Sequence, residues 1–327
     1  MECILRDKKV LVTGGAGFIG SNLTESLLNA GNEVVCLDNF STGKRKNIEE
    51  FLLNPRFRLF EGDIRNFEDC RKAVEGIEYV FHEAALGSVP RSIKDPATST
   101  DVNIGGFVKM LFSSKEEGVK RFIYAASSST YGDHPDLPKV ENKIGSPLSP
   151  YAITKYVNEL YANNFAKTYG IEVIGLRYFN VFGRRQDPDG AYAAVIPKFV
   201  KSLMKHERPK INGDGSVSRD FTYIDNVIQV NHLSALAEDV TALNQVYNVA
   251  HGERTTLNTL FIMIRQKASV FDKSIAEIEP EYGPFRAGDI PHSLASIEKA
   301  RKKLGYSPTH TVDQGLSEAV EWYWNNL

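Results

Sequence analysis

Short apolar segments alternate with stretches of helical spacing through the first half of the chain. Buried strands are predicted at 9–13, 33–37, 57–60, 79–81, 121–125 and 173–176, because each is a short and mostly apolar run. Helices are predicted at 18–30, where apolar side chains recur at helical spacing before Gly31, and at about 150–169. This alternation predicts an α/β fold, a doubly wound parallel sheet with helices on both faces. Ligands of such sheets bind at the carboxyl ends of the strands.

The pattern loosens after about residue 180, where Gly, Pro and Asp become frequent. Helices are predicted near 195–205, 224–238, 257–270 and 312–324. We therefore expect two parts, a sheet domain at 1–180 and a smaller, mainly C-terminal α/β lobe at 181–327. The lobe would lie over the ligand edge of the sheet, with some chain crossing back to the sheet.

Composition narrows the function classes. The 327 residues are 42% hydrophobic and carry 39 Lys and Arg against 41 Asp and Glu, a net charge of −2, so the basic excess of a nucleic-acid binder is absent. No apolar run reaches the roughly 18 residues of a membrane span, and the charged opening leaves no room for a signal peptide. Three cysteines and seven scattered histidines fit neither a disulfide framework nor a zinc site. We expect a cytoplasmic protein without a metal and without nucleic-acid or membrane partners.

A glycine-rich segment follows the first predicted strand and opens the first predicted helix. Gly14, Gly17 and Gly20 would allow a tight turn, a close backbone approach to a pyrophosphate, and close helix–strand packing. The helix N-terminus adds unpaired N–H groups and the positive end of a dipole. Such a loop can also be an ordinary turn, so the glycines need support from residues farther along the chain.

Carboxylates at two later strand ends supply that support. Asp38 ends the second predicted strand, 24 positions after Gly14, where a carboxylate binds ribose hydroxyls and repels the extra phosphate of NADP. NAD is therefore favoured, although Lys44 and Arg45 lie close enough to weaken the inference. Asp63-Ile64 would border the adenine.

A tyrosine and a lysine lie four positions apart, on one face of the 150–169 helix. Tyr151 has an ordinary pKa near 10, and the Lys155 ammonium together with a nicotinium charge is predicted to lower it by about three units, roughly 4 kcal/mol. The hydroxyl run Ser127-Ser128-Ser129-Thr130 ends a predicted core strand and suits a sugar hydroxyl. The alternatives are a solvated helix pair and a Ser/Thr-rich turn.

The glycine motif, Asp38, the Ser127 run and Tyr151-x-x-x-Lys155 together resemble the extended short-chain dehydrogenase/reductase family, over nearly the whole chain. Segments 84–92 and 131–134 are most similar to the UDP-N-acetylhexosamine 4-epimerases of bacterial surface polysaccharide synthesis. The resemblance implies an NAD-binding Rossmann domain that carries the catalytic residues and a nucleotide-sugar-binding lobe.

The resemblance also implies roles for individual residues. Ser127, Tyr151 and Lys155 would be catalytic, with Tyr151 as the acid/base. Cofactor contacts are implied for Gly14, Gly17, Phe18, Ile19, Gly20, Asp38, Asn39, Phe40, Ser41, Thr42, Gly43, Asp63, Ile64, Ala84, Ala85, Asn103, Tyr151, Lys155, Tyr178 and Val181. Substrate contacts are implied for Gly87, Ser88, Ser127, Ser128, Ser129, Tyr151, Asn180, Ala194, Val195, Lys198, Ile211, Asn212, Arg219, Arg286, Asp289 and Ser293. Arg219 and Arg286 would hold the diphosphate, unless each is a surface ion pair.

The implied reaction is NAD-dependent 4-epimerisation of a UDP-N-acetylhexosamine or its uronic acid, through a transient 4-keto sugar. Related dehydratases carry an Asp-Glu pair where this chain has Ser128 and Ser129, so elimination lacks its catalysts. Another nucleotide-sugar enzyme on the same scaffold, such as a UDP-glucose/galactose epimerase or a decarboxylase, and a non-catalytic NAD-binding protein remain as alternatives. Residue patterns leave the preferred sugar and the polymer that uses it undecided.

Two finer expectations follow from the same resemblance. Ser293 lies four positions after Asp289, at a site where relatives restricted to non-acetylated sugars carry a tyrosine, so a serine would leave room for a 2-acetamido group. Alternatively, Ser293 is an ordinary loop serine. The helix of Tyr151 and the one near 100–117 are expected to form a homodimer through a four-helix bundle.

Overall fold

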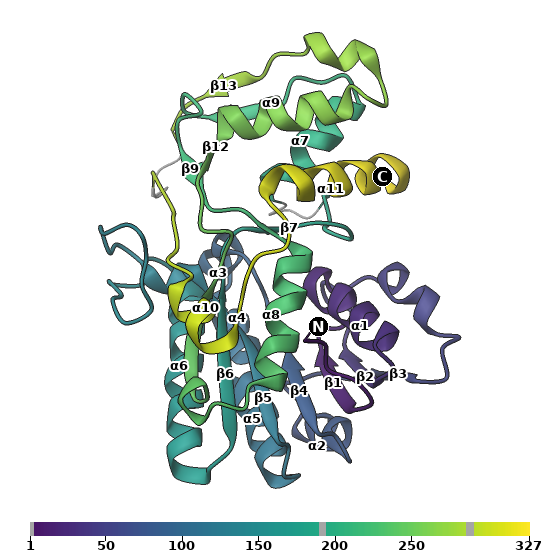
Figure 1. Cartoon of the computed structure of the whole chain (residues 1–327), viewed down its shortest axis with the longest axis vertical. Coiled ribbons are helices and arrows are strands. Elements are labelled where there is room, and N and C mark those ends of the chain that lie inside the picture. The colour runs from purple at the N-terminus through teal and green to yellow at the C-terminus, as the bar shows by residue number, and fades with distance from the viewer. Residues whose placement is uncertain (1–2, 190–193, 286–290) are drawn as a thin grey trace.

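The computed structural model describes residues 3–189, 194–285 and 291–327. Its main feature is a seven-stranded sheet in the order β11-β6-β5-β4-β1-β2-β3, and every neighbouring pair is parallel. The order reverses between β1 and β4, the place where ligands of such sheets bind. This arrangement is the predicted α/β Rossmann-type fold (Figure 1).

Strand side chains alternate between two hydrophobic clusters, one on each face of the sheet. Val10 and Val12 of β1 belong to one cluster and Leu11 to the other. Helices α1 and α8 pack on the first face, and α2, α5 and α6 pack on the second. Burial on both faces explains why the strands read as continuous apolar runs rather than as alternating ones.

The sheet and the helices around it occupy the lower part of Figure 1. The elements in this part of the chain are β1 Lys9–Thr13, α1 Phe18–Asn29, β2 Glu33–Asp38, η1 Arg45–Asn47, η2 Glu49–Phe51, β3 Phe57–Glu61, α2 Phe67–Val74, β4 Tyr79–His82, α3 Val89–Lys94, α4 Pro96–Thr100, η3 Asp101–Gly106, α5 Phe107–Glu116, β5 Arg121–Ser127, η4 Ser128–Tyr131, α6 Pro150–Tyr169 and β6 Glu172–Tyr178.

The rest of the chain forms shorter strands and further helices. They are β7 Val181–Phe182, α7 Val195–Met204, β8 Lys210–Asn212, β9 Ser218–Arg219, β10 Thr222–Tyr223, α8 Ile224–Leu236, η5 Val240–Ala242, β11 Gln245–Val249, β12 Thr255–Thr256, α9 Leu257–Ala268, η6 Lys273–Glu277, β13 Glu281–Gly283, α10 Glu298–Leu304 and α11 Val312–Asn326. Helices α7, α9 and α11 lie above the sheet, whereas α8 and α10 lie beside it (Figure 1). The division of the chain at residue 180 stays a prediction.

Each strand predicted from hydrophobic runs is present, and β5 and β6 extend two residues beyond the predicted carboxyl ends. The extension places Ser127 and Tyr178 at strand ends. The helix predicted near 100–117 is a π-helical segment, Asp101–Gly106, followed by α5. A π-helical turn of this kind often occurs at a functional site.

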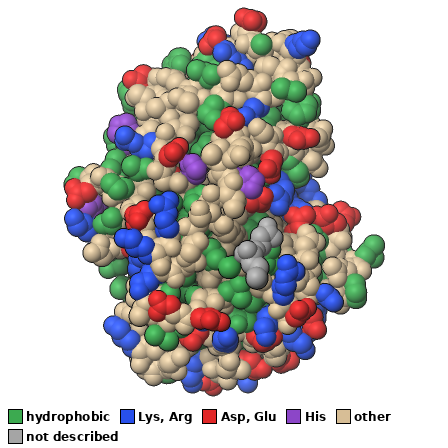
Figure 2. Space-filling model, in the orientation of Figure 1, with side chains coloured by type: hydrophobic (Ala, Val, Ile, Leu, Met, Phe, Trp, Pro, Cys, Tyr) green, Lys and Arg blue, Asp and Glu red, His purple; other side chains and the backbone are tan. Residues whose placement is uncertain are grey.

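The surface carries both signs of charge, interspersed over the face drawn in Figure 2. This mixture on the drawn face fits the net charge of −2. Across the described ranges, no helix combines the length and the apolar character needed to cross a bilayer.

Candidate active site

The turn between β1 and α1 forms a cradle that has no room for side chains at two glycines. A Cβ on Gly20 would lie 2.1 Å from the carbonyl oxygen of Gly14. Gly14 has a φ of +67°, and a Cβ there would lie 2.8 Å from the Ala84 backbone. Glycine is therefore required at both positions because of close backbone approach. Gly17 precedes α1 as its N-cap and supplies no side-chain cap, which leaves the first N–H groups of the helix for an anion.

Asp38 lies at the end of β2, beside this cradle. Its carboxylate accepts hydrogen bonds from the backbone N–H groups of Ala16, at 2.9 Å, and Phe40, at 2.8 Å. Burial raises the pKa of Asp38, while the backbone hydrogen bonds oppose that change. The two bonds fix the carboxylate on the turn, and its remaining lone pairs can accept ribose hydroxyls.

Asp63 and Asn39 form the neighbouring part of the site. Asn39 Nδ2 donates to Asp63 Oδ2 at 2.9 Å, and Arg65 donates to the same carboxylate. The Arg65 hydrogen bond is the main cause that lowers the pKa of Asp63 to about 2. Asp63 is therefore a fixed negative charge that orients Asn39 at the edge of the cavity.

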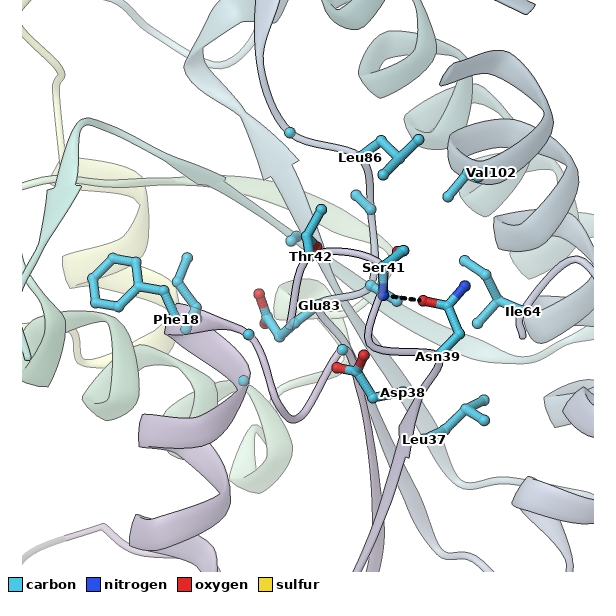
Figure 3. Close-up of a pocket in the computed structure, with 18 of the residues that line it drawn as sticks. Phe18, Leu37, Asp38, Asn39, Ser41, Thr42, Ile64, Glu83, Leu86 and Val102 are labelled. Carbon is cyan, nitrogen blue, oxygen red and sulfur yellow. Dashed lines mark hydrogen bonds between the residues drawn. The ribbon is translucent and has the colours of Figure 1, made fainter. Parts of the chain in front are cut away.

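A cavity of about 360 Å³ runs along the carboxyl ends of these strands (Figure 3). Ile64, Leu86 and Val102 gather at one end of the view, and Phe18 lies at the other. The predicted residues that line it are Gly14, Gly17, Phe18, Ile19, Gly20, Asp38, Asn39, Ser41, Thr42, Asp63, Ile64, Ala84, Ala85, Gly87, Ser127, Tyr151, Lys155 and Tyr178. The fold therefore places most of the predicted cofactor residues and all three predicted catalytic residues around one cavity.

Ser127, Tyr151 and Lys155 meet in this cavity from two elements. Ser127 ends β5, and its Oγ accepts a hydrogen bond from Ser129 Oγ at 2.8 Å. The Tyr151 phenol lies near enough to Ser127 for a side-chain interaction that lowers the phenol pKa. Lys155 lies one turn farther along α6 and donates through Nζ to the carbonyl oxygen of Ala125 at 2.7 Å. The arrangement places a phenol, a hydroxyl and an ammonium in one poorly solvated space.

In the protein without cofactor, the pKa of Tyr151 is not lowered, and the predicted decrease, which includes a nicotinium charge, stays a prediction. Burial raises this pKa, and only the interaction with Ser127 lowers it. The physical reason is desolvation, which disfavours phenolate in a closed cavity, while the Lys155 ammonium is directed to the Ala125 carbonyl. Burial also lowers the pKa of Lys155 to about 8, although the carboxylates of Glu83 and Glu159 oppose that change.

Glu83 is a lining residue that the sequence patterns did not single out. It follows β4, and the Tyr178 hydroxyl donates to its Oε1 at 2.9 Å. Asn231 of α8 in turn donates to the Tyr178 hydroxyl at 3.0 Å. Burial raises the pKa of Glu83 to about 7, while Tyr178 and Lys155 act in the opposite direction. The signal that could have found it is its position directly after a buried strand, at the ligand edge.

A second cavity of about 290 Å³ lies in the part of the chain after β6. The predicted substrate residues Asn180, Ala194, Val195, Asn212 and Arg219 line it, together with Val181, which was predicted to contact the cofactor. Tyr178 lines the first cavity and Asn180 lines the second. Two residues separated only by Phe179 therefore line the two different cavities.

Ser293 lies on a segment that is tied to β9. Its N–H donates to the carbonyl oxygen of Ser218 at 3.1 Å, which is the residue before Arg219. The buried Asp220 carboxylate accepts the N–H of Ala295 at 3.1 Å and also the N–H of His251. These bonds hold the Ser293 segment against the strand that carries Arg219. Burial raises the pKa of Asp220 to about 7.

Several predicted residues do not line either cavity. Asn103 instead braces the loop after β4, because its amide exchanges hydrogen bonds with Leu86 at 2.7 and 3.2 Å. Ile211 is in the hydrophobic core, at 1% exposure. The others are Phe40, Gly43, Ser88, Ser128, Ser129, Lys198 and Ser293. Arg286 and Asp289 lie outside the described residues.

Further lining residues came from the tertiary structure alone. They are Leu37, Gly62, Glu83, Leu86, Val102, Ala125 and Ala126 in the first cavity. Most are apolar residues at or just beyond strand ends, so their chemistry gives no signal in the sequence. Only their position at the ligand edge of the folded sheet identifies them as lining residues.

One group of potential metal ligands lies away from both cavities. Ligand atoms of Asp225, His310 and Glu318 lie within 4.8 Å of one another. The Arg184 guanidinium, however, already donates to Asp225 at 3.1 Å. Since the arginine supplies the positive charge here, we assign no metal to this group.

Comparison with known proteins places this geometry in a family. The model of the NAD dependent epimerase/dehydratase family matches residues 10–250, and the chain belongs to that family. A UDP-N-acetylglucosamine 4-epimerase from Methanobrevibacter ruminantium M1, solved in complex with UDP-N-acetylmuramic acid, is 38% identical with a TM-score of 0.91, over 99% of this chain and 100% of that one.

Two further relatives have other substrates in their names. A UDP-glucuronic acid 4-epimerase from Bacillus cereus, solved with UDP-glucuronic acid and NAD, is 31% identical with a TM-score of 0.87, over 98% of this chain and 100% of that one. A UDP-glucose 4-epimerase of Mycolicibacterium smegmatis is 34% identical over 319 residues, 97% of this chain and 99% of that protein.

The cofactor of the chain is NAD, as the family and the cradle both indicate. The glycine-rich turn and the uncapped start of α1 fit a pyrophosphate, and Asp38 fits a ribose. When bound, NAD supplies a hydride acceptor and donor.

Proposed function

We propose that this protein is a UDP-N-acetylhexosamine 4-epimerase. It interconverts UDP-GlcNAc and UDP-GalNAc, or their uronic acids, through a transient 4-keto sugar, in the cytoplasm, for surface polysaccharide or O-antigen synthesis. The observation that carries the proposal is that Ser127, Tyr151 and Lys155 line the same NAD cavity. The segment that follows β6 connects this cavity to the second one.

Tyr151 and Ser127 act on the proton of the sugar O4. The neutral phenol lies beside Ser127, so the pair can hold the O4 hydroxyl in one orientation. Positive charge near the phenol, from Lys155 and from the bound nicotinamide, favours the phenolate that accepts the O4 proton. The same phenol returns the proton when the keto sugar is reduced on its other face. Positioned acid/base groups of this kind contribute about 10²–10⁴-fold to rate.

The second cavity suits the nucleotide part of the substrate. Arg219 lines it, and its guanidinium fork matches paired phosphate oxygens. Anchoring by the nucleotide would let the keto sugar turn over without leaving the protein. Asn180, with its side chain bonded to the Asp220 carbonyl at 3.0 Å, would lie on the phosphate side.

Epimerisation is favoured over dehydration by the residues beside Ser127. Ser128 and Ser129 belong to η4 and carry only hydroxyl groups, and the Ser129 hydroxyl donates a hydrogen bond to Ser127 Oγ. They offer neither the acid nor the base that removal of water requires. A non-catalytic NAD-binding role is disfavoured because it gives no reason for the shared cavity of Ser127, Tyr151 and Lys155.

The preference for acetylated sugars rests on Ser293. This half-buried serine is held beside the strand of Arg219 by its bond to Ser218, which supports a place near the hexose. A tyrosine at this position would fill the volume that a 2-acetamido group needs. A polar pocket built for that group discriminates strongly against sugars that lack it.

The deciding experiment supplies UDP-GlcNAc, UDP-GlcNAc uronic acid, UDP-Glc and UDP-GlcA separately and follows the products by NMR. We expect the highest kcat/KM with an acetylated sugar. Ser293→Tyr should lower kcat/KM for the acetylated pair at least about tenfold and spare the others, whereas the exposed Ser307→Tyr should change neither. Equal losses on both pairs would remove Ser293 from selectivity, and a preference for UDP-Glc or UDP-GlcA would assign the chain to the alternative substrates.

A homodimer is part of the proposal. Apolar side chains of α6 are exposed in the single chain, with Ile153 at 49% and Leu160 at 51%. Packing of α6 and the 101–116 segment against their copies would bury these side chains.

A further inference from the structure

Lys155 is a charged group in a space that penalises charge. It lines the NAD cavity, and burial lowers its pKa to about 8. Its ammonium donates a hydrogen bond to a neutral acceptor, the Ala125 carbonyl. A buried ammonium normally requires a compensating negative charge. The identity of that counter-charge decides over which pH range Lys155 can assist the phenol.

Two carboxylates act on Lys155, and they differ in their other partners. Glu159 forms a two-pronged ion pair with Arg177, at 2.8 and 2.7 Å, with both side chains buried. Its charge is therefore largely balanced by the guanidinium. Glu83 lines the same cavity as Lys155 and is oriented by a neutral group, the Tyr178 hydroxyl. Of the two carboxylates, Glu83 also raises the pKa of Lys155 more than Glu159 does.

Glu83 is the next residue after the His82–Tyr124 pair of β4 and β5, and Ala125, whose carbonyl binds Lys155, is the next residue on the β5 side. This register places Glu83 beside the end of the Lys155 side chain. Tyr151 and Tyr178 are neutral phenols whose pKa values burial raises. His82, on the strand before Glu83, is fully enclosed, and burial lowers its pKa to about 3, so it is neutral.

We propose that Glu83 is the counter-charge of Lys155, a positioning residue that keeps the catalytic ammonium protonated and so sets the alkaline limit of the active site. The Asn231–Tyr178–Glu83 chain of hydrogen bonds holds the carboxylate in place for this role. The inference uses the Lys155 role in the proposed function, but its first test needs no sugar.

The test is an NMR titration of the NAD-loaded protein, produced with ¹³C-labelled lysine. The Lys155 signal is assigned by its loss in Lys155→Met. Glu83→Gln should move the Lys155 titration midpoint to lower pH by about one pH unit, because an opposite charge nearby favours the charged form. Glu83→Asp, which keeps the charge, should restore most of the midpoint. An unchanged midpoint in Glu83→Gln overturns the proposal.

Matched variants separate charge from structure. Glu75→Gln, which removes an exposed carboxylate after α2, should leave the midpoint unchanged. Tyr178→Phe keeps the Glu83 carboxyl but removes the hydrogen bond that favours its ionised form, so the midpoint should fall by a smaller amount. If Glu83→Gln does not fold, Tyr178→Phe decides, and an unchanged midpoint there overturns the proposal.

A second readout uses activity. The alkaline limb of the kcat profile should move to lower pH in Glu83→Gln, relative to the acid limb of the same profile. A loss that is equal at all pH values would make Glu83 merely structural. Absence of epimerase activity in the wild type would contradict the proposed function and leave the titration result standing.

Discussion

The Ser92 hydroxyl oxygen accepts a hydrogen bond of 3.0 Å from the backbone N–H of Tyr151. Ser92 is fully buried on α3, and its own hydroxyl donates to the Val89 carbonyl at 2.8 Å. Tyr151 lies in the first turn of α6, where backbone N–H groups lack partners within the helix. Ser92 therefore fixes the start of the helix that carries the phenol, and it links that helix to α3.

Ser92→Ala should lower kcat more than it raises KM. The variant leaves the Tyr151 N–H buried and unpartnered, a cost of about 1–3 kcal/mol, and frees the phenol to move. We expect a several-fold lower kcat and a lower Tm, measured by steady-state kinetics and thermal unfolding. Ser113→Ala, at a buried hydroxyl on α5 without a hydrogen-bond partner among the described residues, is the control and should keep kcat. Wild-type kcat in Ser92→Ala would contradict the role.

Tyr151→Phe should fold and keep NAD but lose at least about a hundredfold in kcat. The phenol oxygen lies beside Ser127 in the cavity, so its removal leaves the O4 proton without an acceptor. Circular dichroism and NAD content give the folding control. A variant that retains most of the wild-type kcat would remove Tyr151 from the mechanism.

Purified protein should carry NAD and turn over without added cofactor, because epimerisation returns its hydride. Gly20→Ala should abolish this retention, since a methyl group there would lie 2.1 Å from the Gly14 carbonyl oxygen. NAD released by acid is measured per chain. Gly283→Ala, where the nearest heavy atom is 3.9 Å away, should retain NAD. Wild-type protein that needs stoichiometric NAD would indicate a net oxidoreductase.

Of the three cysteines, Cys3 should be the one that iodoacetamide modifies in the folded protein. Cys3 is exposed, whereas Cys36 and Cys70 are buried. Burial raises the pKa of Cys70 to about 12 and that of Cys36 as well, so neither forms thiolate near neutral pH. Mass spectrometry after labelling at pH 8, with a urea-unfolded control, counts the modified thiols. Rapid labelling of Cys36 in the native state would contradict the burial of its thiol.

Sedimentation should give a mass of two chains at micromolar concentration. Leu160→Glu on the exposed face of α6 should yield a single-chain species, because a charge in an apolar interface is costly. Leu53→Glu, which lies 95% exposed and away from α6, should not. Wild-type protein that sediments as one chain would exclude the proposed dimer.

The sequence alone predicted the strands, the cofactor turn and the set of catalytic residues, because each depends on local chemistry. The strands are apolar runs because both faces of a parallel sheet are buried. Gly14 and Gly20 could be singled out because only glycine fits so close a turn, and Asp38 because a carboxylate at that strand end binds a ribose. The Ser127, Tyr151 and Lys155 set could be proposed from spacing and from family resemblance. Each of these features depends on neighbours within a few residues or on a rule of the fold.

Long-range contacts decided the rest. Glu83, Tyr178 and Asn231 are separated from one another by 53 to 148 positions, and no local pattern shows that they form one chain of hydrogen bonds. The Tyr151 pKa depends on how completely the folded cavity excludes water, which spacing cannot reveal, so the sequence did not show that burial opposes the expected decrease. Ser92 reads as an ordinary helix serine until folding places it against the start of α6. The sequence determined which chemical groups are available, whereas only the tertiary structure decided which of them share one desolvated space.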